Sequence, residues 1–414
     1  MSERAIAVTG LGMVTPAGVG ARATWDGLLA GLPTAATDPV LTGLPQDFSC
    51  RVPDFDAYRQ LGRRLAWRLD RGTQLALVAA REAVADAALD PASWPSCDVA
   101  VVMGVGTCSF EHYEREFARA AAGRPDRVSP FALPRSVPNM VAGEIGLDLG
   151  ARGANLTVST ACASGTTALG VARDLLRSGS CDIVLAGGAE SVCHRIPAIC
   201  FAQMGALSTR RHDPGGASRP FDRDRDGFVL GEGAAVLVLE RSDHARARGA
   251  TARALLTGYG ASCDAHHITS PDPQGRGLAR AIRSALRDAR LGPDDIDHIN
   301  AHGTSTRPND LAEHHAFHSV FTPPPPVTAS KSVLGHAVGA AGAIEAAATV
   351  LTLQHQIVPP TANADTPDPD IDLDIVHKSV RAVRMRTAIS TSSAFGGQNA
   401  AVILSRSAQG LPRP

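Results

Sequence analysis

Lysine is nearly absent from this chain of 414 residues. Of its 40 basic residues only Lys331 and Lys378 are lysines and the other 38 are arginines, which suggests a GC-rich coding background. A lysine that persists in such a sequence is a candidate for a position that needs an ammonium group. The 41 acidic residues bring the net charge to −1, which argues against nucleic acid or an anionic membrane surface as a partner.

Long apolar runs and targeting segments are missing as well. No apolar run reaches the roughly 18 residues that cross a bilayer, and no signal-peptide pattern follows Met1. Eight cysteines in a chain of this length favour free thiols in a reducing compartment. With 44% hydrophobic and 20% charged residues, the chain can bury a sizeable core. We therefore expect a cytoplasmic globular protein of one large domain or two fused halves.

Common ligand motifs are incomplete. Residues 222–227 imitate the start of a calcium loop, but the twelfth position is Gly233, and the nearest acid, Glu232, lies one place early. We expect an arginine–aspartate ion-pair network there instead. Residues 10–12 begin a possible dinucleotide fingerprint, but Thr15 stands where the third glycine belongs.

Other site signals also fail. The three histidines of one predicted helix, His314, His315 and His318, have no second ligand motif beside them, so we expect a solvated helix face. No G-x-S-x-G nucleophile elbow is present. The sequence therefore predicts no metal site.

Short β-rich runs alternate with alanine-rich helical segments, which is typical of an α/β fold with buried strands. Strands are predicted at residues 5–9, 99–103, 183–186 and 234–239, and a helix at residues 75–89.

The C-terminal part repeats this order, with a helix around residues 278–286 and a strand at 296–301. We expect two related halves, residues 1–250 and 251–414. The proline-rich residues 323–326 and the Pro/Asp-rich residues 363–374 are expected to be surface loops.

Cys162 is the strongest candidate nucleophile. It follows a predicted strand at residues 156–158 and precedes a predicted amphipathic helix at residues 164–178. The field of a helix N-terminus is expected to lower the pKa of a thiol at this junction and raise its thiolate fraction. The other reading, a buried structural cysteine, suits Cys181, Cys193 and Cys200 better.

Two histidines lie in glycine-flanked turns after predicted strands. His302 stands in Asn300-Ala301-His302-Gly303-Thr304, and His336 follows Gly335. The rare Lys331 lies five residues before His336. Loops at strand ends are where α/β sheets place their chemistry, so we interpret these three residues as functional.

Taken together, these motifs resemble the β-ketoacyl-acyl-carrier-protein synthase family, of the type with one cysteine and two histidines. The resemblance runs nearly end to end and is carried by segments 8–12, 160–165, 206–209, 217–222, 226–233, 301–304, 331–342 and 395–397.

The resemblance implies the thiolase fold: two pseudo-symmetric βαβαβαββ halves stacked as a five-layered αβαβα sandwich. It implies that Cys162 carries an acyl group, while His302 and His336 serve the decarboxylation of a malonyl unit. The following Claisen condensation would extend the acyl chain by two carbons. Lys331 resembles the family's supporting lysine and Glu345 its neighbouring acid.

The resemblance also assigns the surroundings of these residues. The backbone N–H groups of Cys162 and Phe395 would form the oxyanion hole, with Phe395 at the gate and Thr304 in support. No cofactor is implied beyond the phosphopantetheine of an acyl carrier protein, which is the expected partner. A homodimer or a heterodimer with a chain-length-factor subunit is expected.

Departures from the family pattern bear on the pathway. Residues 391–394 read Thr-Ser-Ser-Ala where relatives often have Asn-Ser-Phe-Gly, so an aromatic ring and a glycine are missing beside Phe395. Arg307-Pro308 stands where Pro-Leu is usual. Small side chains at residues 104–109 are expected to line the acyl channel. These changes favour the ketosynthase of a type II polyketide pathway over a housekeeping fatty-acid elongating enzyme.

Other readings remain. A degradative thiolase needs a second cysteine near the C-terminus, yet the last cysteine here is Cys263, and a ketoacyl synthase of type III has asparagine in place of His336. A non-catalytic, chain-length-factor-like subunit would not need Cys162, His302 and Lys331 together. We therefore predict an acyltransferase of the 3-oxoacyl synthase class.

Overall fold

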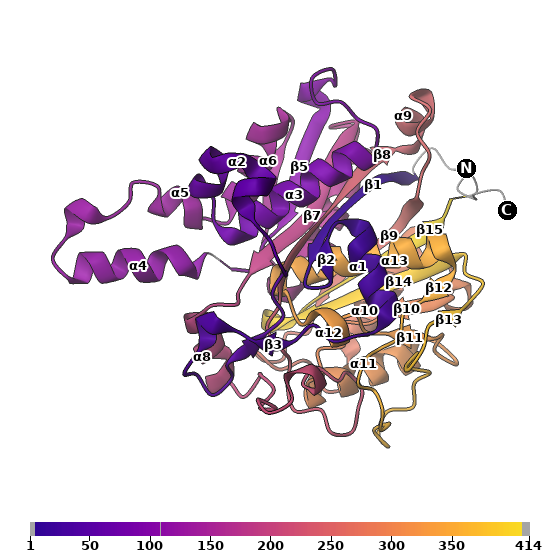
Figure 1. Ribbon diagram of the computed structural model, residues 1–414. Helices are drawn as coiled ribbons and strands as arrows, with labels where there is room; N and C mark the ends of the chain where they lie inside the picture. Colours follow the sequence, from indigo (N-terminus) through magenta and orange to yellow (C-terminus); the bar gives the residue numbers. More distant parts are fainter. Residues whose placement is uncertain (1–4, 108, 408–414) are drawn as a thin grey trace.

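The computed structural model describes residues 5–107 and 109–407, and a mixed sheet of eleven strands runs through it (Figure 1). The strands of its N-terminal part are β1 (Ile6–Thr15), β5 (Val99–Gly104), β6 (Asn155–Val158), β7 (Ile183–Ser191) and β8 (Glu232–Arg241), with the short β2 (Gly18–Val19) paired to β1. Those of its C-terminal part are β9 (Ala254–Cys263), β10 (His298–Asn300), β11 (Val327–Thr328), β14 (Thr387–Ala394) and β15 (Gln398–Arg406).

The two parts of the sheet have the same topology. Their orders are β1-β8-β7-β5-β6 and β9-β15-β14-β10-β11, with antiparallel pairing at the first two steps and parallel pairing at the last two. They join where residues 6–8 of β1 run antiparallel to residues 254–256 of β9. This internal pseudo-symmetry is the one that the sequence predicted.

Helices complete five layers. Helices α3 (Arg71–Asp86) and α6 (Asn139–Leu149) cover the outer face of the N-terminal strands, and α10 (Arg276–Ala289) covers that of the C-terminal strands, with α11 (Arg307–Val320) packed against it. Between the two sets of strands lie α7 (Ser164–Arg177) and α13 (Ala341–His355). The αβαβα arrangement is confirmed.

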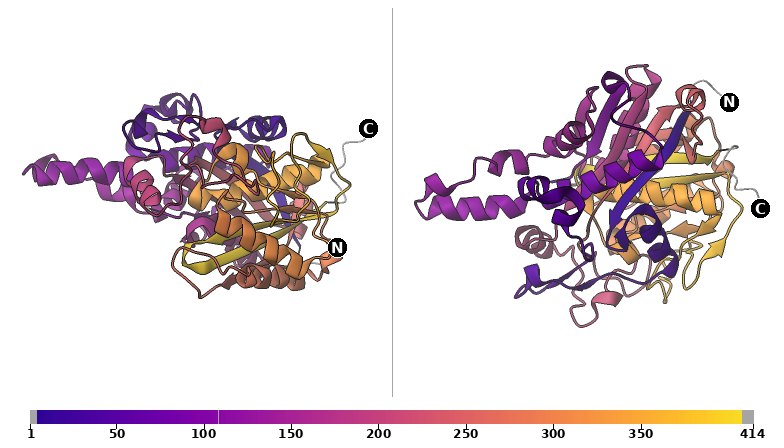
Figure 2. Two further views of the ribbon diagram at one scale, coloured as in Figure 1. Left: turned by 90° about the horizontal axis from the view of Figure 1, so that it is seen from below. Right: turned by 45° about the horizontal axis from the view of Figure 1, so that its top comes forward.

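Smaller elements surround these layers. They are α1 (Ala21–Ala30), α2 (Ala57–Arg68), α4 (Phe110–Ala121), α5 (Ala132–Ser136), α8 (Arg195–Gln203), α9 (Ser242–Ala247), α12 (Lys331–Leu334), and the paired strands β3 (Ala36–Thr37) with β4 (Phe48–Ser49) and β12 (Ile357–Val358) with β13 (Arg381–Ala382). Figure 2 shows α4 projecting from the body, and the chain returns to the body at α5, so that residues 110–136 form an arm.

The central helices bring the candidate site together. Every residue of α13 from Ala341 to Leu353 is buried, and its alanines let it lie between two layers of strands. A Cβ atom on Gly165 of α7 would come within 2.6 Å of the backbone nitrogen of Ala343, so the two helices touch backbone to backbone there. This contact fixes the start of α7 against the segment that follows His336.

Two local predictions need correction. The strand predicted at residues 5–9 continues to Thr15, because Gly10 and Gly12 let the strand lie against α3: a Cβ atom on Gly12 would meet the carbonyl oxygen of Ala79 at 1.9 Å. Within the expected surface loop at 363–374, Asp368 is buried because it pairs with Arg225.

Candidate active site

Cys162 lies in a tight turn between β6 and α7. The turn is a single 3₁₀ segment, Ala161–Ala163, and Ala161 has a positive φ of 47°. Ser164 holds the turn from the helix side, because its hydroxyl donates to the carbonyl of Ala161 at 2.6 Å and accepts from the amide of Thr160 at 2.9 Å. The chain reverses within a few residues, and this places the Cys162 thiol just before the start of α7.

Burial dominates the electrostatics of this thiol. Burial raises the pKa of Cys162 to about 12, although the Lys331 ammonium and the N–H groups of Phe395 and of Cys162 itself act in the opposite direction. The expectation of a lowered pKa is therefore wrong. The resting side chain is a neutral thiol that must give up its proton when it reacts.

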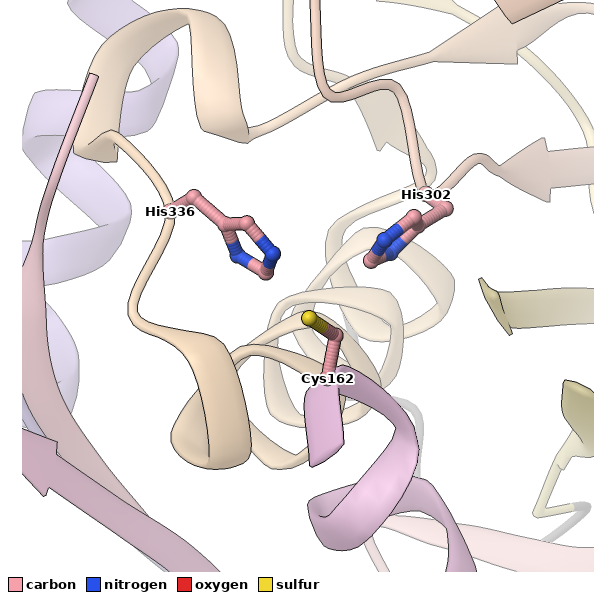
Figure 3. Close-up of side chains that lie close together, drawn as sticks. All are labelled: Cys162, His302 and His336. Atoms are coloured by element: carbon pink, nitrogen blue, oxygen red, sulfur yellow. The ribbon is translucent and has the colours of Figure 1, made fainter. Parts of the chain in front are cut away.

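His302 and His336 face this sulfur from two different loops. His302 follows β10, and His336 lies between α12 and the 3₁₀ turn Val338–Ala340. The two rings are nearly perpendicular, with centroids 5.3 Å apart, and one nitrogen of each lies within 4.8 Å of the other and of the Cys162 sulfur. Figure 3 shows the sulfur pointing between the two imidazoles.

Lys331 determines the tautomer of His302. Its Nζ atom lies 3.1 Å from Nδ1 of His302 and donates to the His302 carbonyl at 2.6 Å, and it forms an ion pair with Glu345. An ammonium group has only donors, so Nδ1 must accept and the ring proton must sit on Nε2. His302 therefore offers an N–H donor on the side away from Lys331.

Both imidazoles are neutral. Burial, followed by the nearby Lys331 charge, holds the pKa of His302 and of His336 well below 6.5. Burial also raises the pKa of the Glu345 carboxyl to about 7, opposed by the attraction of Lys331. The site thus combines a neutral thiol with two neutral imidazoles, and the Lys331–Glu345 ion pair lies beside His302.

Glu313 is a site residue that sequence reasoning missed. It lies on α11, and its two carboxylate oxygens accept the backbone N–H groups of His302 and Gly303, both at 2.7 Å. Asn309 donates to the same carboxylate at 2.9 Å. Glu313 therefore fixes the loop that carries His302. An acid eleven residues after a glycine-flanked histidine, on the helix that follows, was the available signal.

A cavity of about 190 Å³ leads to the three reactive groups. Phe395 lies in its wall as the first residue of the 3₁₀ turn Phe395–Gly397, and its ring centroid is 6.1 Å from that of Phe201. Thr304 and Thr306 lie in the same wall, with their hydroxyl oxygens 2.9 Å apart. Thr304 and Phe395 thus line the same cavity as Cys162, and their roles stay predictions.

The described residues of the expected acyl-channel segment, 104–107 and 109, are not among the residues that line this cavity. Thr107 donates its hydroxyl to Glu190 at 2.8 Å, and the amide of Gly106 donates to the same carboxylate at 2.8 Å. Burial raises the pKa of Glu190 to about 7. Thr107 and Ser109 line a separate small cavity, Cys108 lies outside the described residues, and the lining of the acyl channel stays a prediction.

The other sequence signals resolve into structural roles. Arg225 pairs with Asp310 and Asp368, which confirms the expected arginine–aspartate network, and the absence of a calcium site stays a prediction. The seven cysteines that the structure describes are free, but Cys200 is exposed, so its assignment as a buried residue is wrong. The three histidines of α11 are exposed or half-buried and contact one another or backbone carbonyls.

Within the described part of the chain, one group of side chains has metal-ligating geometry, namely Cys162, His302 and His336. A thiolate and two imidazoles are donors that zinc accepts. The Lys331 ammonium beside His302 opposes a divalent cation at the same place. The sequence expectation of no metal stays a prediction. No described helix is long and apolar enough to cross a membrane.

Comparison with known proteins covers nearly the whole chain. The family model for the N-terminal domain of beta-ketoacyl synthase matches residues 3–245, and the model for the C-terminal domain of beta-ketoacyl synthase matches residues 253–365. The first match contains Cys162, and the second contains His302, Lys331 and His336.

Individual relatives and structures agree with these matches. The chain is 40% identical to the 3-oxoacyl-[acyl-carrier-protein] synthase 2 of Synechocystis sp., over 96% of this chain and 97% of that protein. It is also 40% identical to the tetracenomycin polyketide synthase ketoacyl synthase alpha subunit of Streptomyces glaucescens, over 98% of each. The solved structure of the ishigamide ketosynthase/chain length factor matches with a TM-score of 0.92 and 37% identity, over 98% of this chain and 100% of that one.

Proposed function

The chain belongs to the β-ketoacyl synthase family, and from that premise we propose that it is the condensing ketosynthase of a type II polyketide pathway. It is an enzyme of the acyltransferase class. The observation that carries the proposal is the convergence of one thiol and two neutral imidazoles within 4.8 Å, with the His302 tautomer fixed by Lys331. This arrangement suits thioester exchange followed by decarboxylative condensation.

Acyl transfer comes first in this proposal. The Cys162 sulfur attacks the carbonyl carbon of an acyl thioester on the carrier protein, and a neutral imidazole takes the thiol proton. The N–H groups of Cys162 and Phe395, which already act on the sulfur, stabilise the oxyanion that forms. Collapse of this intermediate breaks the bond to the pantetheine sulfur, and that sulfur leaves with the proton.

Decarboxylation follows on the acylated enzyme. The thioester carbonyl of a malonyl unit accepts hydrogen bonds from Nε2–H of His302 and from His336. Two neutral donors stabilise the enolate formed as carbon dioxide leaves, and no strong base is needed. The enolate carbon attacks the acyl carbonyl on Cys162, the carbon–sulfur bond breaks, and the thiolate takes up one proton from the solvent. The product is a β-ketoacyl chain two carbons longer on the carrier.

The supporting residues act through the histidines. Lys331 holds His302, Glu345 balances the charge of Lys331, and Glu313 fixes the backbone of the His302 loop. Thr304 supports the arm of the substrate from the cavity wall. In this proposal residues 1–250 supply the nucleophile and residues 251–414 supply both histidines, a division supported by the identical strand orders of the two parts.

A second subunit of the same fold completes the proposal. Strand β6 lies at the end of the sheet, and its Leu156 is 40% exposed. The projecting arm carries Phe117 and Leu133, which are 67% and 62% exposed. An unpaired strand edge and apolar side chains on an extended arm are typical of an interface. A chain-length-factor subunit fits this surface, and a second copy of this chain is the alternative partner.

The pathway assignment rests on the cavity wall and on the relatives. Ser393 and Ala394 line the cavity where relatives often carry a phenylalanine and a glycine. One compared relative belongs to a polyketide synthase, and the compared structure is a ketosynthase with a chain length factor. The alternative is a housekeeping fatty-acid elongating enzyme, and the equally similar Synechocystis protein supports this alternative.

The delivery of acyl groups and the cellular location of the enzyme belong to the same proposal. Acyl groups arrive on the phosphopantetheine of an acyl carrier protein, and no resident cofactor takes part. We place the enzyme in the cytoplasm, and the free thiols of the seven described cysteines support a reducing compartment.

Two measurements test the proposal. Incubation with an acyl thioester should add one acyl mass on the Cys162 peptide, and malonyl carrier protein should then yield a β-ketoacyl product. Absence of both would reject the condensing function. For the pathway, the purified chain should elongate saturated medium-length acyl thioesters poorly alone and gain activity with the product of a neighbouring gene. Efficient elongation of saturated chains by the chain alone would favour the fatty-acid alternative.

A further inference from the structure

A second cavity adjoins the entrance to the reactive groups, and two arginines line it without a carboxylate partner. Its volume is about 610 Å³, and it shares Gly205, Thr306 and Pro308 with the cavity that leads to Cys162. Arg210 and Arg307 stand in its wall. Among the described residues, neither has a carboxylate within 4 Å, although salt bridges are frequent elsewhere in this arginine-rich chain.

The two guanidinium groups are anchored to neighbouring backbone carbonyls. Arg210 donates to the carbonyl of Asp224 at 2.8 Å, and Arg307 donates to the carbonyl of Arg223 at 3.1 Å. These carbonyls belong to consecutive residues, whose Cα atoms are about 3.8 Å apart. Each guanidinium has five N–H groups and uses one of them in this way. The Nε–H of Arg210 is buried and has no partner among the described residues.

The acidic residues of the same wall are already occupied. Asp226 accepts hydrogen bonds from Ser208 at 2.6 Å and from both the amide and the hydroxyl of Thr209. Asp224 pairs with the neighbouring Arg223 at 3.3 Å, and it also attracts Arg210 without a contact below 4 Å. The donors left over in the cavity are therefore the two guanidinium groups. An anion between them would relieve the repulsion of two like charges.

The backbone adds to this preference. Arg307 is the first residue of α11, a helix of 14 residues, and no side chain caps that helix end, although its second residue, Pro308, has no N–H group and Asp310 lies in its first turn. The free N–H groups and the dipole of a helix N-terminus favour a negative group. Together with the paired arginines they form a site for a group with several acceptor oxygens, and phosphate fits this requirement better than a single carboxylate.

We propose that this cavity, named here the Arg210–Arg307 cavity, binds the phosphate of the substrate's phosphopantetheine arm. The inference rests on the proposed function, because it assumes that acyl groups arrive on this arm. A thioester that reaches Cys162 through the first cavity leaves the other end of its arm at the entrance, where the two cavities meet. The arginines then fix the arm by its charged end while the thioester reaches the sulfur.

The test compares two substrates that differ only in this phosphate. Acyl-phosphopantetheine and acyl-pantetheine are offered to the wild-type enzyme and to Arg307→Ala, and the rate of Cys162 acylation is followed by mass spectrometry. The wild type should acylate from the phosphorylated substrate at a KM about tenfold lower, the effect of a charge-assisted hydrogen bond. Arg307→Ala should abolish this difference and leave the KM for acyl-pantetheine unchanged.

The controls separate the possible failures. Arg211→Ala removes a neighbouring arginine that is half-exposed and pairs with Asp47, so it should keep the preference for phosphate. Equal KM values for the two substrates in the wild type would overturn the inference. So would an Arg307→Ala effect seen with carrier-bound substrate but not with free acyl-phosphopantetheine, because the arginine would then contact the carrier protein itself. If neither substrate acylates Cys162, it is the proposed function that fails.

Discussion

Lys331 has two effects on the site, one on stability and one on the chemistry, and replacing it by methionine removes both. The side chains of Lys331 and Glu345 are only 3% and 2% exposed and form an ion pair. Removal of one partner of a buried pair leaves the other charge without compensation, which typically costs about 3–5 kcal/mol of unfolding free energy. The same change removes the donor that fixes the tautomer of His302. Loss of one preorganised enolate donor typically costs about 3 kcal/mol of barrier, or roughly 10²- to 10³-fold in rate.

The double variant Lys331→Met with Glu345→Gln distinguishes these effects. It removes both charges, so urea unfolding should show most of the lost stability restored. Malonyl decarboxylation should stay about 10²-fold below wild type, because nothing then holds the proton of His302 on Nε2. Acylation of Cys162, measured by mass spectrometry, should change much less in both variants. Recovery of wild-type decarboxylation in the double variant would refute the tautomer argument and leave Lys331 a purely structural role.

Four further outcomes are expected. Cys162→Ala should abolish the acyl adduct and condensation without changing the thermal unfolding midpoint, and condensing activity in that variant would reject the nucleophile. Because the pKa values of His302 and His336 lie well below 6.5 in the folded state, the stability they contribute is complete above pH 6.5 and is lost as the pH falls, so His302→Asn should flatten the acid side of a plot of unfolding free energy against pH. EDTA should leave the activity of the enzyme unchanged, because the Lys331 ammonium beside His302 opposes a divalent cation among the thiol and the two imidazoles, and a loss of activity that zinc restores would contradict this expectation. Ser393→Phe replaces the hydrogen bond to Asn399 with a ring of about 100 Å² in the cavity wall, which is worth ~2 kcal/mol where it touches substrate, so the relative kcat/KM of acyl thioesters of different length should change by up to about 30-fold.

Local patterns predicted the parts of the site that depend on local geometry. The strand–turn–helix pattern around Cys162 and the glycine beside His302 are properties of short segments, and the structure shows both in the expected kind of turn. The prediction that His336 follows a strand is wrong, because the short helix α12 precedes it. The rarity of lysine added a compositional signal for Lys331. Its contact with His302 could be predicted only from the resemblance to the family, because no feature of the local sequence indicates it.

Contacts between distant segments could not be predicted in this way. Glu313 supports His302 from a helix whose register against the loop depends on the packing of α11. Asp368 is buried because it pairs with Arg225, 143 residues away, and its own segment has the composition of a surface loop. Gly12 indicates a turn when considered alone, yet it lies in a strand because α3 approaches it closely. In each case the deciding partner is distant in sequence.

The error about the Cys162 thiol concerns the balance of two physical effects. A helix N-terminus favours the thiolate by about 0.3–1 kcal/mol at exposed positions. Burial disfavours the thiolate by the full free energy of removing its charge from water, which is larger. In the described structure burial prevails, and the pKa of Cys162 rises to about 12. A neutral resting thiol is a poor nucleophile towards unrelated electrophiles. The N–H groups of Cys162 and Phe395 that favour negative charge at the sulfur are also the groups proposed to bind the thioester oxyanion. The stabilisation that burial denies to the resting thiolate therefore becomes available as the substrate carbonyl arrives, and this couples proton loss from the thiol to the acyl transfer itself.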